Sequence, residues 1–93
     1  PAETRTVHTE YVRFSDLDLR EKEAQKVLKD RVFASANRIC FNGNAGLAQW
    51  ECARATFRKA QPQIESVINR AIAGRPHAEA TLALWGRPAR PGS

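Results

Sequence analysis

Methionine is absent from this sequence of 93 residues, tyrosine occurs once and cysteine twice. No run approaches the ~20 apolar residues of a transmembrane helix, so we expect no membrane span. The sequence also lacks a phosphate-cradling glycine loop, a pair of catalytic carboxylates and the ligand spacing of a metal site, so it indicates no enzyme and no cofactor. Because the chain begins with Pro1 instead of methionine, we expect a processed or trimmed form of a longer chain.

The charge balance is basic, with a formal net charge of +5. Such a charge favours anionic partners such as membrane lipid, polysaccharide or nucleic acid. The basic residues are spread along the chain, however, which is typical of an ordinary solvated surface. A helix-turn-helix motif needs a turn of about 3–4 residues, and the helices expected below have a longer connection, so we expect no nucleic-acid partner. One basic cluster on the second helix, Arg54, Arg58 and Lys59, is a candidate contact for an anionic surface.

Four secondary-structure elements are expected within one domain, residues 1–85. They are a strand, two helices and a short last segment: Thr6–Phe14, Leu19–Ile39, Ala45–Ala73 and Glu79–Trp85. The last segment is either a strand or an irregular stretch whose Trp85 packs on the core. The fold class is therefore α+β and mainly α, an antiparallel two-helix hairpin with the order β-α-α-β. Residues 86–93, with Pro88 and Pro91, are expected to form a disordered tail.

Both predicted helices carry an apolar stripe at the helical period. The first stripe consists of Ala24, Leu28, Val32, Ser35 and Ile39. The second is widened by Ile68 and Ile72 and otherwise consists of Trp50, Ala53, Phe57, Ala60, Ile64, Val67 and Ala71. Asp18, with Glu21 three residues later, predicts a capping box at the first helix, and Asn44 and Gly74 are the expected ends of the second. The second stripe keeps its phase through Pro62, which predicts one kinked helix with Pro62 on its outer face.

The two expected strands are too few to form a stable sheet alone. Their exposed edges would invite pairing between subunits. We therefore expect a homodimer that builds a larger sheet. Four aromatic residues could either form an exposed apolar patch or complete the small core: Tyr11, Phe33, Phe41 and Trp85.

The two cysteines, Cys40 and Cys52, lie at the facing ends of the predicted helices. At about 100° per residue, both flank the seam between the helices, where a disulfide could form without displacing core side chains. A bridge would stabilise the chain by about 3 kcal/mol and would indicate an oxidising compartment. Free buried thiols, a zinc site with His8 and His77, and a nucleophilic cysteine with His77 as its base are the alternatives.

Three segments of the sequence together resemble the UrcA family. The first runs from Val7 through Leu19 and ends in Asp-Leu-Asp-Leu, the second is Asn37–Cys40 at the end of the first helix, and the third begins at Cys52 and ends in Val67–Asn69. The resemblance covers roughly Arg5 to Ala73. The sequence departs from the family pattern at Arg20, where serine or threonine is usual, at Phe41, where glycine is common, and at Pro62.

The resemblance implies a small secreted bacterial protein whose precursor carries a signal peptide and whose two cysteines are bridged. It implies no agreed enzyme activity and no catalytic residues. We therefore expect a non-enzymatic periplasmic or secreted protein. It would either bind a protein partner or itself, or serve in an envelope stress response.

Two alternative functions come with this reading. The family takes its name from a uranium-responsive member, so one alternative is a protein that binds uranyl or another hard cation. Four carboxylates within eight residues would be its ligands, since hard cations prefer oxygen: Asp16, Asp18, Glu21 and Glu23. The second alternative is a protein that binds an anionic envelope surface through the basic cluster.

Overall fold

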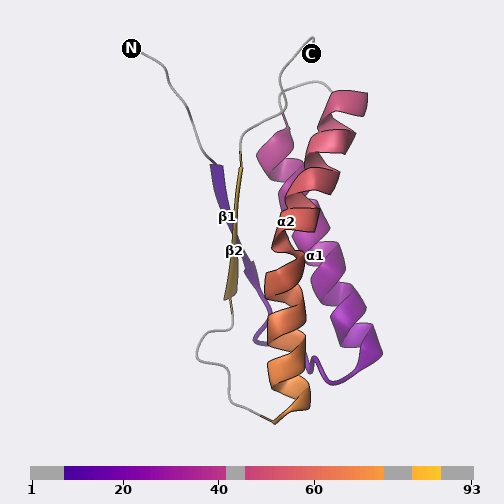
Figure 1. Cartoon of the computed structure of the whole chain (residues 1–93), viewed down its shortest axis with the longest axis vertical. Coiled ribbons are helices and arrows are strands. Elements are labelled where there is room, and N and C mark those ends of the chain that lie inside the picture. Colours follow the sequence, from indigo (N-terminus) through magenta and orange to yellow (C-terminus); the bar gives the residue numbers. More distant parts are fainter. Residues whose placement is uncertain (1–7, 42–45, 75–80, 87–93) are drawn as a thin grey trace.

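The computed structural model describes residues 8–41, 46–74 and 81–86 of the chain. Within them, two helices cover one face of a two-stranded sheet, so the molecule has two layers (Figure 1). The elements in chain order are β1 (His8–Arg13), α1 (Lys22–Cys40), α2 (Leu47–Ile72) and β2 (Thr81–Gly86). This order confirms the predicted β-α-α-β hairpin and the mainly helical α+β class.

The sheet pairs β1 with β2 in antiparallel register, from His8 opposite Gly86 to Arg13 opposite Thr81. The last segment is therefore a strand, and it includes Gly86, which the sequence assigned to the tail. A Cβ atom at Gly86 would lie 3.1 Å from Cγ2 of the buried Ile39, so glycine lets the end of β2 lie close against α1. Residues 87–93 of the expected tail lie outside the described residues.

The core lies between the sheet and the helices. It includes Val12, Leu82 and Leu84 from the strands and a full stripe from each helix. On α1 the buried residues are Leu28, Val32, Ser35, Ala36, Ile39 and Cys40, as the sequence stripe predicted apart from the half-buried Ala24 and the additional Ala36 and Cys40.

The buried stripe of α2 is rotated from its predicted position. Its residues are Ala53, Thr56, Ala60, Ile64 and Ile68. Phe57 and Val67 are only half-buried, and Trp50 is 50% exposed beneath the guanidinium of Arg54, 4.8 Å from the ring centroid. The cause is that α2 packs on two neighbours, α1 and β2, so its buried surface turns toward the sheet.

The predicted capping box at α1 is wrong. The N-cap is Glu21, without a side-chain capping bond, and the helix begins at Lys22. The Asp18 carboxylate instead accepts bonds from the backbone N–H and the guanidinium of Arg20. An arginine two residues away thus takes the carboxylate that the capping box needed. At α2 the N-cap is Gly46, and Asn44 lies outside the described residues.

The second helix is continuous through Pro62, as its phase predicted, and Pro62 lies on its exposed face. It ends at Ile72, followed by Gly74 with a φ of 77°. This left-handed conformation suits glycine and confirms the predicted end of the helix. Neither helix in the described ranges is long and apolar enough to cross a bilayer.

Candidate functional site

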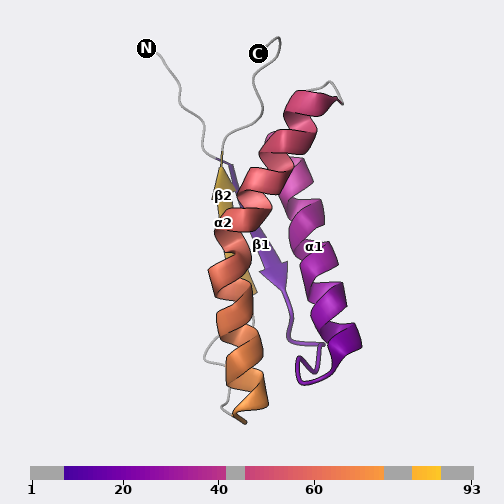
Figure 2. The same cartoon turned by 45° about the vertical axis from the view of Figure 1, so that its right-hand side comes forward.

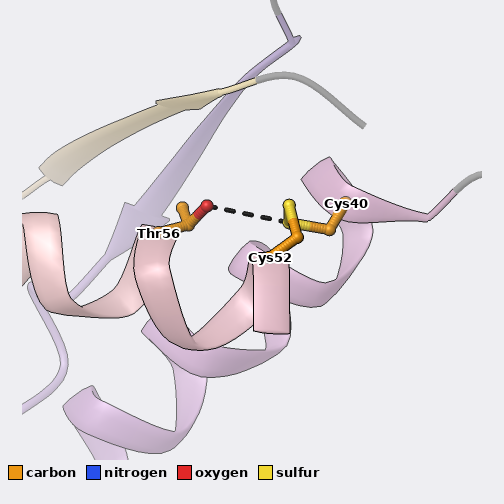
Figure 3. Close-up of a disulfide and its surroundings, with 3 residues drawn as sticks. All are labelled: Cys40, Cys52 and Thr56. Carbon is orange, nitrogen blue, oxygen red and sulfur yellow. Dashed lines mark hydrogen bonds between the residues drawn. A yellow bond between two sulfur atoms is a disulfide. The ribbon is translucent and has the colours of Figure 1, made fainter. Parts of the chain in front are cut away.

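A disulfide joins Cys40 and Cys52 across the seam between α1 and α2 (Figure 3), with a Cα–Cα distance of 5.9 Å. Cys40 is fully buried, and the hydroxyl oxygen of Thr56 lies 3.7 Å from its sulfur. Because a bridged sulfur carries no proton, the Thr56 hydroxyl is the donor. The bridge confirms the predicted staple and leaves neither sulfur as a thiol for zinc or for nucleophilic attack. The side chains of His8 and His77 lie outside the described residues.

The four carboxylates of the acidic segment, residues 16–23, are exposed, and arginine side chains bond to two of them. Asp16 accepts bonds of 2.9 and 2.8 Å from the guanidinium of Arg31, and Asp18 accepts bonds of 2.9 and 3.0 Å from that of Arg20. The bonds from Arg31 lower the pKa of the Asp16 carboxyl from 3.8 to about 2. The bonds from Arg20 lower the pKa of Asp18 in the same way.

This geometry does not bring the four acidic residues into one site. Across residues 8–41, 46–74 and 81–86, no three side chains of His, Cys, Asp or Glu are grouped so that they could hold a metal ion. Glu21 and Glu23 are exposed at the start of α1. Cation binding by this segment therefore stays a prediction, and it would require both aspartate–arginine pairs to open.

The basic cluster is exposed, but its members lie in different surroundings. Arg54 stacks on Trp50, while Lys59 lines a small hollow of about 170 Å³ beside Trp85. Arg58 is exposed as well. Anionic-surface binding by these three residues also stays a prediction.

The face of the sheet that points away from the helices is uncovered by any described element (Figure 1). It presents two large aromatic side chains, Tyr11 at 68% and Trp85 at 53% exposure. They stand on neighbouring strands, since Tyr11 pairs with Ala83 and Trp85 with Thr9. Of the other two aromatic candidates, Phe41 is 56% exposed, whereas Phe33 packs edge-to-face on Phe57 with a centroid distance of 5.8 Å.

Two hollows that share Gln63 lie between α2 and β2, and together they are here called the edge groove. Its larger part has a volume of about 590 Å³ and its smaller part is the hollow beside Trp85. One wall is a row on α2 spaced four, three and four residues apart: Lys59, Gln63, Ser66 and Arg70. The other wall is β2, and the Gln63 amide donates a bond of 3.4 Å to the carbonyl oxygen of Ala83. The sequence did not predict this groove, although Lys59, Gln63, Ser66 and Arg70 follow a helical 4-3-4 spacing in it.

The outer edge of β1 differs because arginines of α1 reach it. Arg31 donates a bond of 2.9 Å to the carbonyl of Arg13. Arg38 pairs with Glu10 at 2.9 Å and also donates to the hydroxyl of the buried Ser35 at 2.8 Å. An arginine thus occupies one carbonyl of this edge, and charged side chains near a strand edge are a common way to prevent strand addition.

Comparisons of the chain with protein-family models, with curated proteins and with solved structures found no match. The resemblance to the UrcA family therefore stays a prediction.

Proposed function

We propose that this chain is a non-enzymatic, exported protein that binds another protein through the uncovered face of its sheet. The observation that carries the proposal is the exposure of Tyr11 and Trp85 on neighbouring strands of that face. Aromatic side chains of this kind are enriched where proteins bind one another, because they bury a large apolar area and lose little conformational freedom. A second copy of the chain is one partner of this kind.

Two features support a periplasmic or secreted location. The disulfide between Cys40 and Cys52 is of a type that persists in oxidising compartments and is rare in the cytosol. The ordered segments that resemble the UrcA family, whose members are exported, agree with the same location.

The test compares the wild-type chain with a Tyr11→Ser/Trp85→Ser variant. Sedimentation equilibrium measures self-association, and capture from an envelope extract measures partners. We expect the wild type either to self-associate or to retain a defined partner, and the variant to lose that contact while keeping its melting temperature. A partner held equally well by both proteins would exclude the sheet face as the binding surface. An Arg54→Ser variant is the control, because Arg54 is exposed on α2, away from this face.

A further inference from the structure

The edge groove combines a strand edge that no other described strand pairs with and a flanking helix. We propose that it binds an extended polypeptide segment as an added strand beside β2, with an apolar side chain under α2 and acidic residues toward the ends of the segment. The proposal rests on the proposed function only in that the protein is a binding protein. It uses the edge of β2, and the two surfaces meet at Tyr11 and Trp85, which also line the edge groove.

The hydrogen-bonding groups of β2 that face the groove follow from the register. The carbonyl of Ala83 accepts from Gln63 on α2, so it points away from β1. In an antiparallel ladder the N–H and C=O of one residue point to the same side, and the side alternates along the strand. The backbone groups of Thr81, Ala83 and Trp85 therefore face the groove. An incoming strand can bond to these groups, as in other peptide sites that extend a sheet.

The position of α2 favours a single strand over a second copy of the chain. Among the described elements, α1 packs on both strands, whereas α2 packs on β2 and not on β1. In Figure 2, α2 lies over β2 and α1 lies toward β1, so α2 borders the open edge. A second copy that paired through β2 would bring its own α2 to the same seam. One extended segment needs only the space that the groove already offers.

The side chains that line the groove determine which residues a bound segment would carry. Its floor is apolar and includes Leu82, Leu84 and Val67. Arg70 lies at the end near Thr81 and Lys59 at the end near Trp85, and no acidic side chain among the described residues lines either part of the groove. Strand geometry gives room for about five residues along this edge. The groove therefore fits a short segment that is apolar in the middle and acidic toward its ends.

Gln63 lies at the centre of the groove and bonds to β2 where the backbone of an added strand would bond. Its bond to the Ala83 carbonyl is long, at 3.4 Å, and occupies the acceptor that the N–H of an added strand would use. A flexible side-chain amide can move aside when that N–H arrives. Of the two sheet edges, only that of β1 has arginine side chains bonded across it in the described structure.

The test uses a displayed library of random peptides of about ten residues, selected against the oxidised full chain. Ala83→Pro is the counter-target, because proline removes the outward N–H and leaves the ladder to β1 intact. Thr9→Pro makes the same change on the edge of β1. Arg70→Glu tests the charge, and Arg58→Glu is its control with an equal change in net charge outside the groove. The melting temperature of each variant shows that it folds.

We expect the selected peptides to alternate apolar residues and to carry aspartate or glutamate toward their ends. Their Kd should rise roughly tenfold in Ala83→Pro, because a donor is lost and an acceptor is left unpaired. It should rise roughly threefold or more in Arg70→Glu and stay unchanged in Thr9→Pro and Arg58→Glu. Hydrogen exchange of the Ala83 amide should be fast in the free protein and slow in the complex.

Several outcomes would overturn the proposal. One is a failure to select any peptide, and another is selected peptides that bind Ala83→Pro and Arg70→Glu as tightly as the wild type. Loss of binding only in Tyr11→Ser/Trp85→Ser would assign recognition to the uncovered face, so the proposed function would stand without the groove. The Ala83 amide could also be protected from hydrogen exchange in the free protein. If that protection depends on protein concentration, a second copy of the chain pairs with the edge of β2. Protection at all concentrations would assign it to the chain itself.

Discussion

Single arginine side chains bond to carboxylates and to a backbone carbonyl of this small protein, and those groups are then not free to bind a ligand. Arg31 bonds both to the Asp16 carboxylate and to the backbone carbonyl of Arg13, so one side chain ties the turn after β1 to α1. Arg20 holds Asp18 and thereby removes it from the helix cap. These contacts are exposed, so each contributes little to stability, but together they leave few free carboxylates in the acidic segment.

The pair formed by Asp16 and Arg31 predicts a measurable titration. Arg31 lowers the pKa of the Asp16 carboxyl to about 2, so the carboxylate stays charged well below its ordinary pKa of 3.8. The stabilisation from this pair is therefore complete above about pH 4 and is lost as the pH falls toward 2. In Arg31→Gln we expect the pKa of Asp16 to return toward 3.8, measured by NMR of the side-chain carboxyl carbon. Arg20→Gln should shift Asp18 and leave Asp16 where it is.

Among the elements, α2 carries the most roles, because it packs on α1, flanks β2 and holds one cysteine. It does so as an unbroken helix from Leu47 to Ile72 despite Pro62 in its interior. Proline there removes one helical hydrogen bond and crowds the preceding turn. The apolar contacts on either side of Pro62 hold the two halves in one register.

This arrangement predicts that Pro62 reduces the stability of the chain. We expect Pro62→Ala to raise the free energy of unfolding by about 1–3 kcal/mol, because the helix regains an N–H donor and loses a steric clash. Urea denaturation measures the change. Ser66→Ala, one turn further on at another exposed position of α2, is the control and should give less than about 0.5 kcal/mol. Equal stability of Pro62→Ala and the wild type would mean that the helix has already relaxed around the proline.

At the scale of the whole molecule, a thin core is closed by two connections between elements, the disulfide and the pairing of β1 with β2. The bridge joins residues 12 positions apart at one end of the hairpin. A chain of this size buries a modest fraction of its surface, so each connection is a large part of the total stability.

We expect the loss of the bridge to lower the melting temperature by more than about 10 °C, since closing this loop contributes about 3 kcal/mol and each kcal/mol shifts a domain of this size by about 4–8 °C. Calorimetry with and without reductant measures the shift. A Cys40→Ala/Cys52→Ala variant should melt at the lower temperature and show no response to reductant. A wild-type transition that reductant leaves in place would contradict the prediction.

Much of this architecture could be predicted from local sequence patterns. The helical period located both helices and carried the second through Pro62, and the positions of Cys40 and Cys52 at facing helix ends predicted the bridge. Local patterns could not predict which face of α2 its neighbours bury. The predicted stripe included Trp50 and Phe57, whereas packing on β2 buries Thr56 and leaves Trp50 exposed.

The candidate sites were harder to predict for a related reason. Because Asp16 and Asp18 are close in sequence, they suggested one cation site. In the structure each aspartate forms an ion pair with a different arginine. The edge groove depends on the distance between α2 and a strand that follows it in the chain. No short window of sequence contains both walls.

The pairing of β1 with β2 has a consequence for the order of folding. Residues at opposite ends of the described chain meet in this sheet, from His8 with Gly86 to Arg13 with Thr81, whereas the contacts between α1 and α2 near the disulfide are local in sequence. Contacts with low sequence separation form early, and those that close a long loop form late. The oxidised hairpin should therefore assemble first and the sheet last. The binding edge of β2 would then exist only in the fully folded chain, so premature pairing of that strand with other chains is limited to the brief interval before the sheet closes.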